Sequence, residues 1–328
     1  MNLLVTGCCG FIGSNFVKLL LAERPGFRIV NLDALTYAGN RANLADEEKN
    51  APGYAFCHGD IRRPEDVERA LGMLPGPVDA IVNFAAESHV DNSIRNPGLF
   101  VETNVGGTAT LLQAARANKC RFLQVGTDEV YGSLGPTGLF TEETPLAPNS
   151  PYSASKAAAD LMVLAWRRTY GLDALVTRCS NNYGPYQFPE KLIPLALTRL
   201  MTGGKVPVYG KGLNVRDWLY VEDHCRGILL ALEKGAAGEV YNIGGFNEWR
   251  NIDIVRELLR LMDCGEDRME FVADRLGHDM RYAIDSTKIT RELGWRPRHT
   301  FETGLPETVR WYREHRAWWE ALLGRKAP

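Results

Sequence analysis

The stretch Val125-Gly-Thr-Asp-Glu-Val-Tyr-Gly132, followed by Tyr152-Ser-Ala-Ser-Lys156, brings several chemically active side chains together. The run before it, residues 121–125, is short and mostly apolar, which predicts a buried parallel strand. Thr127, Asp128 and Glu129 then lie where that strand ends. In open α/β sheets, ligands bind outside the carboxyl ends of the strands. The stretch therefore predicts a doubly wound parallel sheet with a functional site at this edge.

Asp128 and Glu129 are adjacent carboxylates, which would repel each other if both stayed ionised. We therefore expect the pKa of one of them to rise, which suits a paired acid and base near neutral pH. A solvated Asp-Glu turn is the alternative interpretation. Tyr152 and Lys156 favour catalysis, because a spacing of four places both on one helical face. There, a lysine ammonium would lower the pKa of a phenol from its usual value of about 10.

A glycine-rich motif, Gly7-Cys-Cys-Gly10-Phe-Ile-Gly13, lies between an expected strand over residues 2–6 and an expected helix over residues 15–23. This context is typical of a dinucleotide site, where a tight turn and a helix N-terminus bind pyrophosphate. An ordinary turn is the alternative, since the spacing is G-x-x-G-x-x-G. Asp33 ends the next expected strand, over residues 27–32, and would accept hydrogen bonds from an adenosine ribose. That position favours NAD over NADP.

Two further expected strands, over residues 54–58 and 78–84, end at the same edge. Asp60 follows the first and would either meet the adenine or cap the next helix. Small residues follow the second, in Phe84-Ala-Ala-Glu-Ser-His89, and would let the backbone approach a cofactor. We interpret His89 as structural rather than catalytic.

The composition excludes several classes of protein. Across 328 residues, 38 Lys and Arg are balanced by 40 Asp and Glu, for a net charge of −2, so neither nucleic acid nor an anionic membrane is expected as a partner. No apolar run reaches the roughly 18 residues that a membrane span needs, and no basic leader precedes the glycine turn. The seven cysteines, an odd number, lack metal-ligand spacing, so we expect a reduced, cytoplasmic protein without a metal site.

The character of the sequence changes after the strand expected over residues 172–177. Residues 181–194 are rich in Pro, Asn and aromatic side chains, and we interpret them as a crossing into a smaller substrate-binding lobe. We expect a Rossmann-type NAD-binding domain over 1–178 plus about 214–246, and an α/β lobe over about 179–213 and 247–328. Long helices are expected over 98–118, 152–170, 222–233 and 301–323, and a last strand of the main sheet over 239–243.

These motifs, in this order, resemble those of the extended short-chain dehydrogenase/reductases. Within that family, Thr127-Asp128-Glu129 is similar to the motif of the dTDP-glucose 4,6-dehydratases. The similarity covers nearly the whole chain and includes Phe84-Ala-Ala-Glu-Ser-His-Val-Asp91, Cys179-Ser-Asn-Asn-Tyr-Gly-Pro185, Phe188-Pro-Glu-Lys-Leu-Ile-Pro194 and Arg216-Asp-Trp218.

The resemblance implies NAD as the cofactor and a nucleotide sugar, most simply dTDP-glucose, as the substrate. The residues that it implies for NAD are Gly7, Gly10, Phe11, Ile12, Gly13, Asp33, Leu35, Thr36, Asp60, Ile61, Phe84, Ala85, Ala86, Ser88, Thr103, Tyr152, Lys156 and Asn182. Those that it implies for the nucleotide sugar are Ser88, Thr127, Asn181, Lys191, Leu192, Pro207, Tyr209, Arg216, Asn251, Arg275 and His278. Arg216 and Arg275 suit a diphosphate, because guanidinium groups match phosphate oxygens.

The resemblance also implies a reaction, catalysed by Thr127, Asp128, Glu129, Tyr152 and Lys156. Tyr152 takes the proton of the sugar O4, Glu129 removes the C5 proton, and Asp128 protonates the departing C6 hydroxyl. The product is a 4-keto-6-deoxy sugar. A homodimer is implied as well, through a four-helix bundle built from the helices over 98–118 and 152–170.

Two alternative functions follow from the same residues. An epimerase or decarboxylase of this superfamily would share the NAD site and the Tyr152/Lys156 pair, but would not need the Asp-Glu pair after Thr127. A non-catalytic NAD-binding module would have little reason to keep a complete set of acid, base and phenol.

Overall fold

The central element is a parallel sheet of seven strands in the order β10-β6-β5-β4-β1-β2-β3. The computed structural model describes residues 1–274 and 279–324. The strands are β1 (Asn2–Thr6), β2 (Arg28–Asp33), β3 (Tyr54–His58), β4 (Ala80–Asn83), β5 (Arg121–Thr127), β6 (Ala174–Cys179) and β10 (Val240–Ile243). The order of the strands reverses between β1 and β4, which is where ligands bind in doubly wound folds. The predicted fold class is confirmed.

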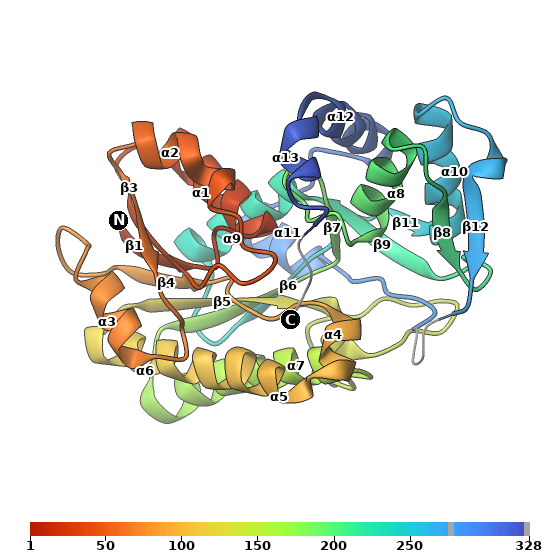
Figure 1. Ribbon diagram of the computed structural model, residues 1–328. Coiled ribbons are helices and arrows are strands. Elements are labelled where there is room, and N and C mark those ends of the chain that lie inside the picture. The colour runs from red at the N-terminus through yellow and green to blue at the C-terminus, as the bar shows by residue number, and fades with distance from the viewer. Residues whose placement is uncertain (275–278, 325–328) are drawn as a thin grey trace.

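Helices cover both faces of this sheet (Figure 1). One face carries α3 (Pro64–Leu71), α6 (Thr108–Asn118) and α7 (Pro151–Tyr170), and the other carries α1 (Phe11–Glu23), α9 (Val221–Lys234) and α11 (Thr287–Leu293). Neighbouring strand residues alternate between the two cores. Leu4 packs with Leu111 on the first face, and Leu3 packs with Phe16 on the second. Because both faces are buried, the strands are mostly apolar, as the sequence indicated.

A smaller part of the chain forms a second core beside the carboxyl edge of the sheet. It contains a three-stranded sheet of β7 (Asn181–Tyr183), β9 (Val215–Tyr220) and β11 (Glu248–Arg250), and a pair of β8 (Val206–Tyr209) and β12 (Met269–Val272). Around these lie α8 (Leu192–Met201), α10 (Asn251–Leu261), α12 (Phe301–Glu314) and α13 (Arg316–Glu320). Strand β9 pairs with β7 and β11. Its Leu219 packs into the main core, while Trp218 and Tyr220 pack into the second.

The remaining short elements connect these layers. They are the 3-10 helices η1 (Arg41–Leu44), η3 (Asp128–Tyr131) and η4 (Glu266–Arg268), the helices α2 (Ala45–Asn50), α4 (Val90–Arg95) and α5 (Pro97–Phe100), and the π-helix η2 (Val101–Gly107). None of the helices in residues 1–274 and 279–324 combines the length and apolar character that crossing a bilayer requires.

Two long helices differ from their predicted form. The helix expected over 98–118 consists of α5, η2 and α6, with π geometry in the middle. In that segment the Asn104 side chain bonds both the N–H of Glu87 (2.9 Å) and its carbonyl (3.0 Å), and donates to Ser155 (2.8 Å). The helix expected over 301–323 is broken at His315, between α12 and α13.

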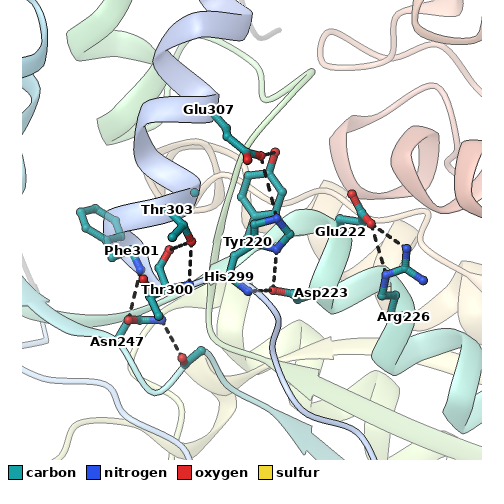
Figure 2. A network of polar contacts seen from close by, with 12 residues as sticks. Tyr220, Glu222, Asp223, Arg226, Asn247, His299, Thr300, Phe301, Thr303 and Glu307 are labelled. Carbon is teal, nitrogen blue, oxygen red and sulfur yellow. Dashed lines mark hydrogen bonds and ion pairs between the residues drawn. The ribbon is translucent and has the colours of Figure 1, made fainter.

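A polar network joins α9, which packs on the main sheet, to the start of α12 (Figure 2). The buried carboxylate of Asp223 accepts hydrogen bonds from both the backbone N–H (2.8 Å) and the imidazole Nδ1 (3.0 Å) of His299. The other imidazole nitrogen lies 3.9 Å from Glu307 of α12, and the Tyr220 ring packs on the imidazole at 4.3 Å between centroids. One residue before Asp223, Glu222 forms a more exposed pair with Arg226 at 2.7 Å.

This network predicts very different effects for two neighbouring acidic residues. Asp223→Ala should lower the free energy of unfolding by about 2–4 kcal/mol, because it leaves two donors of His299 unpaired in the interior. Glu222→Ala should cost only about 0.3–0.5 kcal/mol, the usual worth of an i,i+4 ion pair. Urea unfolding followed by circular dichroism measures both values. Equal losses would show that Asp223 does not anchor α12.

Candidate active site

A cavity of about 840 Å³ opens at the carboxyl edge of the main sheet, under residues 180–191 of the second part. Its wall includes the segments that follow β1, β2, β3, β4, β5 and β6. The turn after β1 and the segment after β4 face each other across the point where the strand order reverses. The site is therefore where the sheet topology predicts ligand binding.

The glycine turn runs unusually close to its neighbours. Gly7 has a φ of +73°, and a Cβ on it would lie 2.6 Å from the backbone nitrogen of Ala85. A Cβ on Gly13 would lie 2.7 Å from the Cα of Cys8. Only glycine permits both approaches. The narrow backbone cradle left in front of α1 fits the pyrophosphate of a dinucleotide, because it leaves room for close backbone contact at a helix N-terminus.

Asp33 lies at the end of β2 and is almost fully buried. Its two carboxylate oxygens accept hydrogen bonds from the backbone N–H groups of Cys9 and Leu35, each at 2.8 Å. Burial raises the pKa of this carboxyl group above its ordinary value. Each oxygen keeps a further lone pair for a hydroxyl donor, so the arrangement remains compatible with a ribose.

Asp60 lies on the cavity wall and does not cap the following helix. The N-cap of α3 is Arg63, which makes no side-chain capping bond. The Asp60 carboxylate instead accepts from the backbone N–H (2.9 Å) and the guanidinium of Arg62. Of the two interpretations of this residue, the capping one is wrong.

The two adjacent carboxylates occupy different environments. Asp128 is buried, and one of its oxygens has no hydrogen-bond partner among the described residues. Burial, reinforced by the neighbouring Glu129 carboxylate, raises the pKa of Asp128 well above its ordinary value. Glu129 is only partly buried, and its backbone N–H donates to the Thr127 hydroxyl at 3.3 Å. The expected rise of one carboxyl pKa is confirmed, and it falls on Asp128.

Tyr152 and Lys156 lie in the first turns of α7, which Ser150 and Ser153 begin with a capping box. Both side chains border the cavity. The Lys156 ammonium donates to the Val125 carbonyl at 2.7 Å, and burial lowers its own pKa. The pKa of Tyr152 is raised by burial and by Glu129. The prediction that Lys156 lowers this pKa is wrong for this structure, because desolvation dominates.

Behind these residues a buried ion pair fixes α7 against the sheet. Arg178 of β6 donates to the Asp160 carboxylate at 2.8 Å, with both side chains almost fully buried. The same guanidinium donates to the Tyr131 hydroxyl at 3.0 Å, which donates to Asn242 at 2.8 Å. Burial lowers the pKa of Lys156, and the negative charge of Asp160 opposes this shift. The network places the face of α7 that carries Tyr152 and Lys156 toward the end of β5.

Most of the predicted residues border this one cavity. All five predicted catalytic residues do, as do all of the predicted NAD residues except Leu35, whose backbone instead holds Asp33. Of the predicted sugar-nucleotide residues, Ser88, Thr127, Asn181 and Lys191 line the cavity. Leu192, Pro207, Tyr209, Arg216 and Asn251 do not, and Arg275 and His278 lie outside the described residues.

Arg216 lies next to the cavity but is turned toward backbone. Its guanidinium donates to the carbonyls of Val215 and Asp279, both at 2.8 Å, and packs 4.3 Å above the Tyr282 ring. Burial lowers its pKa, and Glu129 is among the charges that oppose this shift. Because the charges of Glu129 and Asp128 both act on Arg216, the guanidinium lies near these two carboxyl groups.

Several residues on the cavity wall were not predicted, among them Tyr37, Gln187, Phe188 and Glu190. The Tyr37 hydroxyl donates to Glu190 at 3.0 Å, and so joins the loop after β2 to the segment before α8. His89, interpreted as structural, lies 3.8 Å from the same carboxylate. The dense aromatic and polar composition of residues 181–194 was a sequence signal that could have placed Glu190 on the cavity wall. No sequence pattern indicated a place there for Tyr37.

His224 was also missed. It is fully buried in α9, and its Nδ1 lies 2.9 Å from the side-chain oxygen of Asn182 on the cavity wall. Burial lowers the pKa of His224 to about 3, so the ring is neutral and acts as a fixed support. Within residues 1–274 and 279–324, no group of His, Cys, Asp and Glu side chains could hold a metal ion.

Comparison with known proteins identifies relatives across almost the entire chain. The profile of the GDP-mannose 4,6 dehydratase family matches residues 4–308. The dTDP-glucose 4,6-dehydratase of Xanthomonas campestris pv. campestris is 52% identical over 339 residues, covering 98% of this chain and 95% of the relative.

Solved structures agree. The dTDP-glucose 4,6-dehydratase of Streptomyces venezuelae, solved with NAD bound, has a TM-score of 0.94 and 55% identity, covering 98% of this chain and 100% of that one. The corresponding Bacillus anthracis protein, in complex with NAD, has a TM-score of 0.91 and 52% identity, covering 98% and 99%. With Thr127, Asp128, Glu129, Tyr152 and Lys156 gathered at one cavity, the chain belongs to the dTDP-glucose 4,6-dehydratase family of the extended short-chain dehydrogenase/reductases.

Proposed function

We propose that the chain converts dTDP-glucose into dTDP-4-keto-6-deoxyglucose with NAD as a recycled cofactor. The reaction comprises oxidation at C4, loss of water across C5 and C6, and reduction at C6. The observation that carries the proposal is a buried carboxyl group, Asp128, whose pKa is raised, beside the more accessible Glu129 in the cavity of Tyr152. The seven unpaired cysteines support a reducing compartment, the cytoplasm.

The residues at the β1–β4 crossing suit NAD. The turn of Gly7, Gly10 and Gly13 would hold the pyrophosphate, Asp33 the adenosine ribose and Asp60 the adenine. When bound, NAD would supply the hydride acceptor for oxidation at C4 and, once reduced, the hydride donor for reduction at C6. The cofactor-bound relatives support this assignment.

Tyr152 would accept the proton of O4 while C4 is oxidised. Burial opposes its ionisation, so the phenolate requires nearby positive charge. Lys156, four residues along α7 and fixed to the Val125 carbonyl, would supply a positive charge from the protein. Thr127, at the end of β5, would hydrogen-bond the resulting ketone, which acidifies the C5 hydrogen.

Asp128 and Glu129 would then divide the elimination between them. A carboxyl group that stays protonated can donate to the leaving C6 hydroxyl, whereas a more exposed carboxylate can remove the C5 proton. The raised pKa of Asp128 supports this division. An epimerase needs neither step, and a non-catalytic module needs no such pair, so the carboxylates favour the dehydratase over both alternatives.

The nucleotide-sugar portion of the substrate would lie toward the second part of the chain. We assign NAD binding to 1–178 and about 214–246, and substrate binding to the lobe over about 179–213 and 247–328. Asn181 and Lys191 already border the cavity. Arg216 would exchange its carbonyl partners for the diphosphate, a stronger, charge-assisted interaction.

The recycled cofactor leads to a labelling prediction. dTDP-glucose deuterated at C4 should yield product deuterated at C6, with no net accumulation of reduced cofactor, because one cavity holds every intermediate. Mass spectrometry and proton NMR of the product locate the label. Mixing with a second, differently labelled substrate should give no crossed product. An epimerase would return deuterium to C4, and that result would remove the proposal.

The raised pKa of Asp128 leads to a second prediction. Between the unfolded pKa of about 3.9 and the higher folded value, the folded protein binds more protons than the unfolded one, so stability falls as pH rises through that interval. Asp128→Asn should therefore be more stable than the parent at pH 7, with the difference shrinking toward pH 4. Its dehydration rate should fall about 10²- to 10⁴-fold. Thermal unfolding across pH, together with turnover, checks both; lower stability at pH 7 would contradict the burial argument.

We also propose a homodimer formed by the outer face of α4, η2 and α7. Three apolar side chains on these helices are exposed, namely Ile94 (52%), Val101 (57%) and Leu161 (55%). A partner surface would remove this apolar area from water. In Figure 1 these helices lie together on the side of the sheet away from α1.

Light scattering at micromolar concentration tests the dimer. The chain should show twice the mass of 36.6 kDa. Leu161→Lys should give the single mass, because a charge in the interface would be desolvated. Leu213→Lys, at a leucine of the second part of the chain that is 44% exposed, is the matched control and should remain a dimer. A single mass for the parent chain would exclude the proposal.

A further inference from the structure

A single side-chain hydrogen bond joins the end of the second part of the chain to the cofactor side of the sheet. The indole Nε1 of Trp318, in α13, donates to the side-chain oxygen of Asn43, in η1, at 2.8 Å across 275 positions of sequence. Figure 1 shows α13 on the side of the second part that faces α1. Asn43 is only 3% exposed and Trp318 is partly buried, so this bond is partly shielded from solvent.

Asn43 passes the contact on to the glycine turn. Its side-chain amide donates to the carbonyl of Cys9 at 3.0 Å, and the backbone N–H of Asn40 donates to the same carbonyl at 2.8 Å. The N–H of Cys9 donates in turn to Asp33 at 2.8 Å. Cys9 is thus held on both sides, and Trp318 lies two hydrogen bonds from the backbone expected to bind pyrophosphate.

The Trp318 ring is itself held by residues that lie beside another wall of the cavity. It packs edge-on against Tyr186 at 5.7 Å and against Trp311 at 5.0 Å between centroids. Tyr186 has a φ of +68°, uncommon for a residue with a side chain, and it directly precedes Gln187 on the cavity wall. The Tyr312 hydroxyl donates to the Gln187 carbonyl. Helices α12 and α13 therefore contact Tyr186 and Gln187, and α13 reaches the glycine turn through Asn43.

We propose that Trp318 and Asn43 are positioning residues that hold the glycine turn closed around NAD and slow its release. The inference rests on the proposed function, in which NAD is regenerated in each turnover and has no need to leave. A plain packing role for Trp318 predicts something else: a loss of stability without a selective change in NAD binding.

The test compares variants that keep the aromatic packing. Trp318→Phe removes the indole donor but retains a ring, and Asn43→Ala removes both the bond from Trp318 and the bond to the Cys9 carbonyl. Trp311→Phe is the matched control, because Trp311 packs in the same group and, within the described part of the chain, has no side-chain hydrogen bond to residues 1–50. Each purified holoenzyme is loaded with radiolabelled NAD and chased with unlabelled NAD, without any sugar nucleotide, and melting temperatures are recorded.

We expect Trp318→Phe to release NAD about three- to tenfold faster than the parent, the usual worth of one neutral hydrogen bond. The control variant Trp311→Phe should release NAD at a rate within about twofold of the parent's. Asn43→Ala should release NAD at least as fast, and the double variant Trp318→Phe/Asn43→Ala no faster than Asn43→Ala, because both act through one contact. With saturating NAD, turnover should fall less than NAD affinity.

Unchanged release from Trp318→Phe, equal acceleration in Trp311→Phe, or additive effects in the double variant would each overturn the proposal. Because release is measured without substrate, these outcomes do not depend on which sugar nucleotide the enzyme uses. A failure of the labelling experiment with dTDP-glucose is therefore distinguishable from a failure of this contact.

Discussion

The buried ion pair between Arg178 and Asp160 is the contact on which the geometry of the site depends. Breaking such a pair leaves an uncompensated charge in the interior and typically costs about 3–5 kcal/mol, so α7 is strongly constrained in its register against β6. Asp160, Lys156 and Tyr152 follow one another at intervals of one helical turn. Fixing the first therefore fixes the other two at the end of β5, with the ammonium on the Val125 carbonyl.

A second constraint separates two carboxylates that are neighbours in sequence. The 3-10 turn after β5 directs Asp128 into the interior and leaves Glu129 partly exposed. In the proposed function, differential burial rather than residue type assigns the acid role to Asp128 and the base role to Glu129. The arrangement is costly, because a buried oxygen of Asp128 has no partner among the described residues. Unfavourable features such as this unpaired buried oxygen are expected mainly at functional sites.

The parts of the fold that were predicted are those that local patterns determine. Short apolar runs predicted the strands, and the polar residues after them, such as Thr127 and Asp33, reached the expected cavity. The parts that were missed depend on contacts between distant segments. The π turn at Asn104 forms because its side chain reaches Glu87, and the pairing of Tyr37 with Glu190 spans 153 positions. Neither leaves a periodic signal in the sequence.

The contact between Trp318 and Asn43 has a consequence for biosynthesis. A ribosome adding about 5–20 residues per second needs roughly 14 to 55 seconds to traverse the 275 positions between them. Strands β3, β4, β5, β6 and β10 are synthesised during that interval, while the glycine turn still lacks its distal support. The contact that we propose to retain NAD is therefore among the last to form on each chain.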